Sequence, residues 1–321
     1  MRYIDFHCDT LSLYRTTPPA GESLRQNSGC VDFRRMREAG CSAQFFAVFF
    51  PPADQLDTDD FSYFCRLYMP FLRELEICRD SVALTKTYGD YVKHRQEGRT
   101  SAFLTLEDGR LLRNSHDNLD FLFECGVRLI TLTWNGPNCL GWPNSDDPTV
   151  MKQCLTPFGR EAVEHMNRLG ILVDVSHLSD GGFWDVAEIS SKPFIASHSN
   201  ARALSPHRRN LTDPMIRRLA EKGGVIGVNF APFFLSPDLN NTKSTVSLLC
   251  RHIQHLYRIG GLECIVLGSD WDGFEGDLEI PDPCALPLLF EELHRQGFPA
   301  SALEKMAWGN AERVLMDCLP S

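Results

Sequence analysis

The sequence predicts one (β/α)8 barrel over residues 1–321, an α/β fold, from three observations. Eight short apolar runs of strand length recur along the chain. Segments with helical spacing separate most of these runs, and no change of composition marks a linker. The polar side chains suited to chemistry directly follow several of the runs. They would therefore meet at the carboxyl end of the barrel, where this fold places active sites.

The predicted strands cover residues 3–6, 41–50, 101–106, 127–133, 172–175, 194–196, 225–229 and 264–268. Helices are predicted over 33–40, 58–79, 92–98, 118–125, 157–169, 179–191, 213–222 and 247–259, with further helical segments in 286–316. Asp32 is a typical N-cap for the first helix, and Gly40 is a typical stop. Pro70 is expected to kink the helix over 58–79.

Composition excludes several classes of protein. Hydrophobic residues make up 43% of the chain, enough for a large core, and no window approaches the ~18 uncharged apolar residues of a membrane span. The net charge of −10, without a basic tract, argues against nucleic acid and anionic membrane as partners. The 12 cysteines form no C-x-x-C pair, and the N-terminus shows no apolar leader. We therefore expect a cytoplasmic protein with reduced thiols.

Two histidines follow neighbouring predicted strands. His177 comes after the run 172–175 and His198 after 194–196, and the segment between them has the length of one crossover helix. Parallel strands joined in this way point in the same direction, so both imidazoles emerge at the same end of the sheet. Matching positions in consecutive units favour a shared metal over two unrelated strand caps.

Three further candidate ligands follow the first and third predicted strands. His7 and Asp9 are two residues apart, so in an extended segment they face the same side and can bind one cation. Glu107 follows the third strand, where a carboxylate can cap a turn or bridge two ions. With His177 and His198 they provide three imidazoles and two carboxylates, which suit zinc or a similar divalent ion.

These five residues can bind two ions if Glu107 bridges them. One ion is then bound by His7, Asp9 and Glu107, and the other by Glu107, His177 and His198. Each ion keeps an open position for a shared water. Two Zn²⁺ would lower the pKa of that water toward neutrality and supply hydroxide.

Two more residues are candidates for the remaining chemistry. Asp270 follows the eighth predicted strand and can carry a proton from the water to a leaving amine, although S-D-W-D-G is also a typical turn. Arg209 lies eleven residues after His198 and can bind a substrate carboxylate through two hydrogen bonds. Spacing alone leaves a plain surface role for Arg209 equally open.

The motifs that contain these residues resemble the membrane (renal) dipeptidase family of dizinc metallopeptidases. The similarity runs nearly end to end through IDFHCDT, LTLEDG, LVDVSHLSD, FIASHSNAR, HRRN, GVIGVNF and GSDWDG. The resemblance implies a distorted (β/α)8 barrel of the metal-dependent hydrolase type. The family's zinc ligands fall on His7, Asp9, Glu107, His177 and His198, with Glu107 as the bridge. Its substrate-carboxylate Arg falls on Arg209 and its catalytic Asp on Asp270.

One position departs from the family pattern. Mammalian members have a His after the fourth strand, in an LTLTH context, that helps to stabilise the oxyanion. This chain has Trp134 followed by Asn135 there. The indole N–H or the Asn135 amide can donate a hydrogen bond, but neither carries a positive charge. We expect both residues to contact the substrate, and Trp134 to shape the pocket.

The sequence therefore predicts a zinc-dependent dipeptidase whose substrate is a small dipeptide with a free carboxylate. The resemblance leaves open a D-residue at the C-terminal position and a homodimeric assembly. A lactone, cyclic amide or phosphoester hydrolase on the same barrel is less favoured, because such enzymes often bridge their metals with a modified Lys, and no Lys follows strand three or four. A metal-binding relative with little turnover is the third reading, favoured by Trp134 alone. His252 and His255, on a predicted helix, are interpreted as packing or surface residues.

Overall fold

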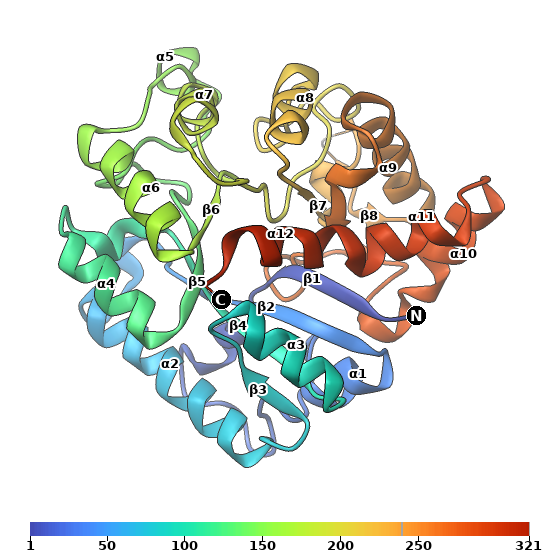
Figure 1. Ribbon diagram of the computed structural model, residues 1–321, viewed down its shortest axis with the longest axis horizontal. Coiled ribbons are helices and arrows are strands. Elements are labelled where there is room, and N and C mark those ends of the chain that lie inside the picture. The colour runs from blue at the N-terminus through green and yellow to red at the C-terminus, as the bar shows by residue number, and fades with distance from the viewer. Residues whose placement is uncertain (239, 321) are drawn as a thin grey trace.

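The computed structural model describes residues 1–238 and 240–320 and shows a curled parallel sheet surrounded by helices (Figure 1). Neighbouring strands of the main sheet follow the order β6-β5-β4-β2-β1-β9-β7, and β3 also pairs with β4. The strands are β1 (Tyr3–Cys8), β2 (Cys41–Phe49), β3 (Val82–Leu84), β4 (Thr100–Glu107), β5 (Val127–Thr131), β6 (Leu172–Asp174), β7 (Ile226–Val228) and β9 (Ile265–Leu267). A separate small sheet pairs β8 (Lys243–Ser244) with β10 (Asp277–Leu278).

The segment 194–196 joins the two ends of the main sheet. Asp174 at the end of β6 forms a parallel bridge with Ile195, and Ala196 forms one with Ile226 of β7. The segment makes isolated bridges rather than a regular strand, but it occupies the place of the predicted sixth strand. The order around the wall is thus β1, β2, β4, β5, β6, 194–196, β7, β9, and the predicted barrel fold is confirmed.

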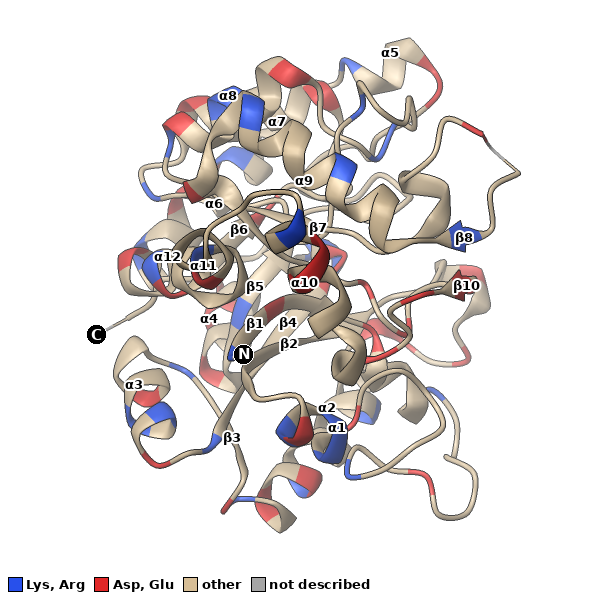
Figure 2. Cartoon of the chain, turned by 90° about the vertical axis from the view of Figure 1, so that its right-hand side faces the viewer, with Lys and Arg blue, Asp and Glu red and all other residues tan. Residues whose placement is uncertain are grey.

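The helices lie outside this sheet (Figure 1). They are α1 (Phe33–Glu38), α2 (Asp60–Ile77), α3 (Tyr88–Gln96), α4 (His116–Cys125), α5 (Pro148–Met151), α6 (Pro157–Leu169), α7 (Asp180–Ile189), α8 (Asp213–Glu221), α9 (Val246–Gly260), α10 (Pro287–Arg295), α11 (Ala300–Glu304) and α12 (Asn310–Cys318). Asp32 caps α1 as predicted, since its side chain accepts a hydrogen bond from the Arg35 N–H. Figure 2 shows acidic and basic residues interspersed over the helices of one face. Within the described residues, no helix is long and apolar enough to cross a membrane.

Several short elements were not predicted. β3, α5, β8 and β10 have four residues or fewer, too few to show a strand or helix period. The predicted helix over 58–79 is present as α2 and includes Pro70, although a proline in a helix interior costs about 3 kcal/mol. Its buried face, which includes Phe64, Leu67 and Phe71, packs into the hydrophobic core and offsets that cost.

The side chain of Glu107 points into the interior of the barrel because of its position on β4. Phe6, Phe45 and Phe103 stack across β1, β2 and β4, with ring centroids 4.6 and 4.5 Å apart. Alternate side chains of a strand share one face, so Glu107 lies on the same face of β4 as Phe103, further toward the carboxyl end. Val314 of α12 packs in the same cluster as Phe6, and α12 covers the amino end of the barrel (Figure 1). The carboxyl end is left open for a site.

Candidate active site

Glu107 is the centre of a buried polar cluster at the carboxyl end of the strands. Its Oε1 lies 3.0 Å from Nε2 of His177 and 3.6 Å from Nε2 of His198. Its Oε2 lies 3.4 Å from Nε2 of His7. The two carboxylate oxygens therefore face two different sets of nitrogen donors, which is the arrangement that a bridging ligand requires.

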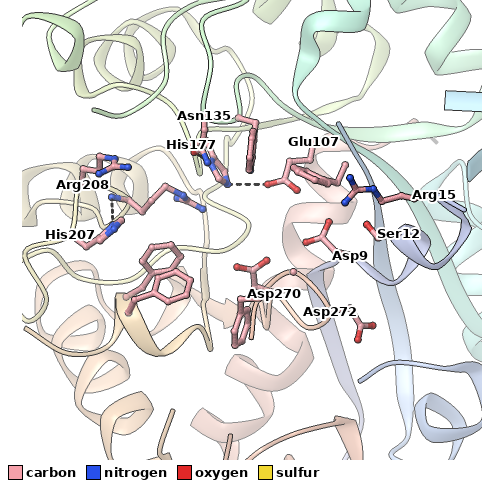
Figure 3. Close-up of a pocket in the computed structure, with 17 residues that line it drawn as sticks. Asp9, Ser12, Arg15, Glu107, Asn135, His177, His207, Arg208, Asp270 and Asp272 are labelled. Carbon is pink, nitrogen blue, oxygen red and sulfur yellow. Dashed lines mark hydrogen bonds and ion pairs between the residues drawn. The ribbon is translucent and has the colours of Figure 1, made fainter. Parts of the chain in front are cut away.

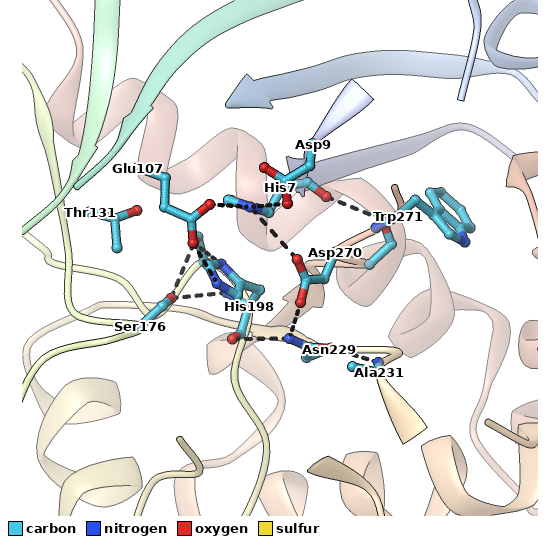
Figure 4. A network of polar contacts seen from close by, with 12 residues as sticks. His7, Asp9, Glu107, Thr131, Ser176, His198, Asn229, Ala231, Asp270 and Trp271 are labelled. Atoms are coloured by element: carbon cyan, nitrogen blue, oxygen red, sulfur yellow. Dashed lines mark hydrogen bonds and ion pairs between the residues drawn. The ribbon is translucent and has the colours of Figure 1, made fainter. Parts of the chain in front are cut away.

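The second set of donors is completed by carboxylates that follow β1 and β9. Nε2 of His7 lies 3.4 Å from Oδ2 of Asp9 and 3.8 Å from Oδ1 of Asp270 (Figure 4). Neither ring nitrogen of the buried His7 has a hydrogen-bond partner within the described chain. Nε2 of His177 and Nε2 of His198 are 3.1 Å apart. Unpartnered imidazole nitrogens that converge with carboxylates match the donor set of zinc and similar divalent ions.

The far side of His198 is held by a hydrogen-bonded chain. The Nδ1 atom of His198 lies 2.8 Å from the hydroxyl of Ser197, and this hydroxyl donates to Oδ2 of Asp174 at 2.6 Å. Because Ser197 donates its proton to Asp174, it accepts one from Nδ1, which leaves the Nε2 lone pair directed at the cluster. Such outer contacts orient metal-binding histidines. His177 is held in a similar way, with Nδ1 3.3 Å from Oδ1 of Asn135.

The electrostatics of the cluster favour a bound cation. Burial, and next the neighbouring charge of Asp9, raises the pKa of Glu107 to about 7. Burial lowers the pKa of His177 and of His198 well below the ordinary value, so both imidazoles are neutral, the form that binds metal. Burial also lowers the pKa of His7, but the carboxylates of Glu107 and Asp9 raise it more, to well above the usual value. The His7 side of the cluster therefore takes up positive charge.

Asp270 occupies a strained backbone position next to this cluster. Its φ is +63°, in the left-handed region, and its N–H donates to the His7 carbonyl at 3.2 Å. The side-chain amide of Asn229 donates to Oδ2 at 2.8 Å. Burial raises the pKa of Asp270 to about 6. A carboxyl group with a pKa near neutrality is suited to both accept and release a proton.

Arg209 is buried at the opposite side of the cluster from β2. Its guanidinium donates to the carbonyls of Ser176 and His198, the latter at 3.4 Å, and its Nε has no partner within the described residues. Its carbon Cζ lies 5.3 Å from the ring centroid of Phe234. Burial lowers the pKa of Arg209 to about 10, so the group remains charged at neutral pH. It is thus a fixed cation with unused hydrogen-bonding capacity.

A cavity of about 390 Å³ opens over these residues (Figure 3). Of the nine residues predicted for the site, seven line it: Asp9, Glu107, Trp134, Asn135, His177, Arg209 and Asp270. His7 and His198 lie beneath it in the cluster. The structure therefore brings all nine together. The Trp134 ring lies edge-on to Phe49, with centroids 4.8 Å apart, and forms part of the wall.

Sequence reasoning missed several other residues of the wall. Ser12, Arg15 and Phe49 line one side of the cavity, and His207, Phe233 and Phe234 contribute elsewhere. Phe49 lies near the carboxyl end of a predicted strand, and this position was the one feature of the sequence that could have indicated a place in the site. His207 begins the HRRN motif but was not assigned to the site. Ser12, Arg15, Phe233 and Phe234 lie in or directly after short 3-10 helices that no motif marks.

The two histidines of α9 are structural, as predicted. Nδ1 of His252 accepts a hydrogen bond from the Ala201 N–H, and its Nε2 donates to the Leu235 carbonyl. Nε2 of His255 lies 2.6 Å from a carboxylate oxygen of Asp213. Neither residue lines the cavity above the cluster.

Comparisons with known proteins agree with this geometry. A model of the family described as membrane dipeptidase (peptidase family M19) matches residues 1–318. Dipeptidase tcpJ of Claviceps purpurea is 28% identical over 298 residues, which are 90% of this chain and 69% of that protein.

Two solved structures are also similar. A metallopeptidase from Rhodobacter sphaeroides, solved with a phosphinate mimic of the dipeptide L-Ala-D-Ala, is 26% identical, with a TM-score of 0.88 and 99% of each chain covered. The metallopeptidase dipeptidase AC, of the same family M19, is 26% identical, with a TM-score of 0.87, and covers 100% of this chain and 99% of its own.

Proposed function

The chain belongs to the membrane dipeptidase family, peptidase family M19, and from this premise we propose that it hydrolyses dipeptides with two bound zinc ions. Membership makes it a metal-dependent hydrolase that acts on dipeptides. The observation that supports two ions is the position of Glu107, whose Oε1 faces His177 and His198 while Oε2 faces His7.

The five donors fit two ions that share Glu107. His7 and Asp9 would hold one ion, and His177 and His198 the other. When bound, such ions lower the pKa of a water molecule and polarise the scissile carbonyl. The choice of zinc rests on the donors, which are imidazole and carboxylate without thiolate.

The residues around the cluster would orient the substrate. Arg209 would bind the C-terminal carboxylate of the dipeptide, because its buried guanidinium keeps an unpartnered Nε and has few competing acceptors. Trp134 and Phe49 close the wall of the cavity and limit the size of the side chains that it accepts. Fixing both ends of a small substrate in this way reduces the entropic cost of reaction.

Asp270 would move the proton. Its Oδ2 is held by Asn229, and its other oxygen faces the cluster, so it can take a proton from the attacking water and give it to the leaving amine. The oxyanion would be stabilised without a charged imidazole, since Trp134 occupies the position after the fourth strand where mammalian members have a His.

We extend the proposal to dipeptides with a C-terminal D-residue. The Rhodobacter sphaeroides relative was solved with a phosphinate mimic of L-Ala-D-Ala. A C-terminal residue of either configuration can bind its carboxylate to Arg209, because Arg209 contacts the carboxylate rather than the side chain.

One preparation tests both parts of the proposal. Protein purified without chelator should contain two divalent ions per chain by elemental analysis. The same material should hydrolyse members of a dipeptide library that includes L-D pairs. No more than one tightly bound ion after zinc is supplied would refute the bridged pair, and absence of dipeptide turnover would refute the activity.

A further inference from the structure

Arg15 brings a second guanidinium to the wall of the cavity. It follows the 3-10 helix η1 (Thr10–Tyr14), directly after β1 and the candidate ligand Asp9. It lines the cavity beside Ser12 and Phe49, and its Cζ lies 5.9 Å from the ring centroid of Phe49. Its N–H donates to the Ser12 carbonyl at 3.0 Å, and Arg66 donates to its carbonyl at 3.2 Å. The backbone at Arg15 is therefore held in place.

Arg15 and Arg209 lie on opposite sides of the metal-binding cluster. In the order around the barrel, β2 and the segment 194–196 are separated by three strands in each direction. Phe49, next to Arg15, ends β2, whereas Arg209 contacts the carbonyl of His198, just beyond 194–196. Figure 3 shows Arg15 at one end and Arg208 at the other, with the carboxylates of Glu107, Asp9 and Asp270 between them.

The guanidinium of Arg15 lacks the partners that the other cavity arginines have. Arg208 forms an ion pair with Asp146, and Arg209 donates to two carbonyls. Among residues 1–238 and 240–320, the half-buried side chain of Arg15 has no ion pair or hydrogen bond, and neither does the hydroxyl of Ser12. Two groups of donors thus face the cavity without an acceptor from the protein. A carboxylate would satisfy both, because a guanidinium binds it through paired N–H donors and a hydroxyl can add a third.

We propose that Arg15 and Ser12 bind an acidic side chain on the N-terminal residue of the substrate, so that the enzyme prefers dipeptides beginning with Asp or Glu. This inference rests on the proposed dipeptidase function. With the C-terminal carboxylate at Arg209 and the peptide bond over the cluster, the N-terminal residue extends toward β1 and β2. It reaches the side of the cavity that Arg15, Ser12 and Phe49 form.

Matched substrate pairs test the inference. Glu-Ala and Gln-Ala differ by one charge at nearly constant shape, as do Asp-Ala and Asn-Ala. The wild-type enzyme should favour the acidic member of a pair on the order of 10- to 100-fold in kcat/KM, as expected for hydrogen bonds to a charged group. Arg15→Gln should remove this preference, and Arg15→Glu should reverse it in favour of Lys-Ala.

Arg2→Gln is the matched control. Arg2 precedes the amino end of β1, whereas the cavity lies at the carboxyl end. Its Cζ lies 3.5 Å from the ring centroid of Trp308. The substitution removes the same charge far from the cavity and should leave the preference intact.

Three outcomes would overturn the inference. Equal turnover of Glu-Ala and Gln-Ala by the wild type would refute it and leave the dipeptidase function standing. An unchanged acidic preference in Arg15→Gln would remove Arg15 from recognition. If no dipeptide were hydrolysed at all, the proposed function would fail and the inference with it.

Discussion

The side-chain amide of Asn229 donates a 2.8 Å hydrogen bond to Oδ2 of Asp270, while Oδ1 of Asp270 faces Nε2 of His7 at 3.8 Å (Figure 4). The oxygen of the same Asn229 amide accepts from the Ala231 N–H at 2.7 Å. The hydrogen bond from the Ala231 N–H therefore holds the Asn229 amide in one orientation, and the amide in turn restricts the rotation of the Asp270 carboxylate. It acts through Asp270, as a positioning residue.

Asn229→Ala should lower kcat by roughly tenfold, the order expected for one lost hydrogen bond to a charged group, and leave KM and metal content nearly unchanged. Steady-state kinetics and elemental analysis of the same protein check this. Asn310→Ala is the control, because Asn310 is also buried and donates to two backbone carbonyls, but at the start of α12. It should reduce stability without lowering kcat. Equal kcat values for Asn229→Ala and the wild type would show that Asp270 needs no such support.

Glu107→Gln should reduce metal occupancy far more than Asp270→Asn. An amide offers one oxygen where the carboxylate offers two, so the substituted side chain cannot face both sets of nitrogen donors as a ligand. Asp270→Asn should keep its metal and lose turnover by on the order of 10²-fold or more, since a proton carrier is removed. Metal content and kcat measured on both variants separate the two roles. Wild-type activity in Asp270→Asn would exclude Asp270 from the mechanism.

Arg209→Ala should impair hydrolysis of dipeptides with a free C-terminal carboxylate much more than hydrolysis of the same dipeptides with an amidated C-terminus. The paired Arg–carboxylate contact is lost in the first case and is never made in the second. The comparison of kcat/KM for each substrate pair provides the measurement. Similar losses for both would indicate that Arg209 mainly holds the carbonyls of Ser176 and His198.

Trp134→Ala should broaden the range of accepted side chains and raise KM, because the edge-on contact with Phe49 is lost and the cavity widens. Trp134→His should give no gain in kcat if the carbonyl is polarised without an imidazole from this position. Kinetics on small and large dipeptides distinguish the two effects. A hundredfold rise in kcat for Trp134→His on unchanged substrates would instead mean that the missing imidazole limits the rate, consistent with the ~2.7–4 kcal/mol of one oxyanion donor.

Asn135 makes one contact that its sequence position did not indicate. Its Oδ1 faces Nδ1 of His177 at 3.3 Å, which leaves its NH₂ group available to the cavity. The residue is thus placed both to orient a candidate ligand and to donate to a substrate.

The sequence by itself determined the barrel and the position of the candidate ligands along the chain. His7 and Asp9 are two residues apart, and side chains alternate along extended backbone, so both were expected on one side. Glu107 was placed at the carboxyl end of the third predicted strand. Parallel connections then bring His177 and His198 to the same end. These features depend on residues that are close in the sequence, so they can be predicted without knowledge of the tertiary structure.

Tertiary structure alone decided which loops meet above that end. Asn229 and Asp270 are 41 residues apart, and neither residue carries a signal of their contact. Arg15 lies in a loop without a motif and becomes a cavity residue only when η1 packs beside the end of β2. The bridges at Ile195 and Ala196 close the barrel wall between β6 and β7. The apolar run 194–196 predicted a strand there, but its three residues do not show which strands it pairs with. Contacts between loops depend on how the whole barrel closes, and no local period in the sequence encodes them.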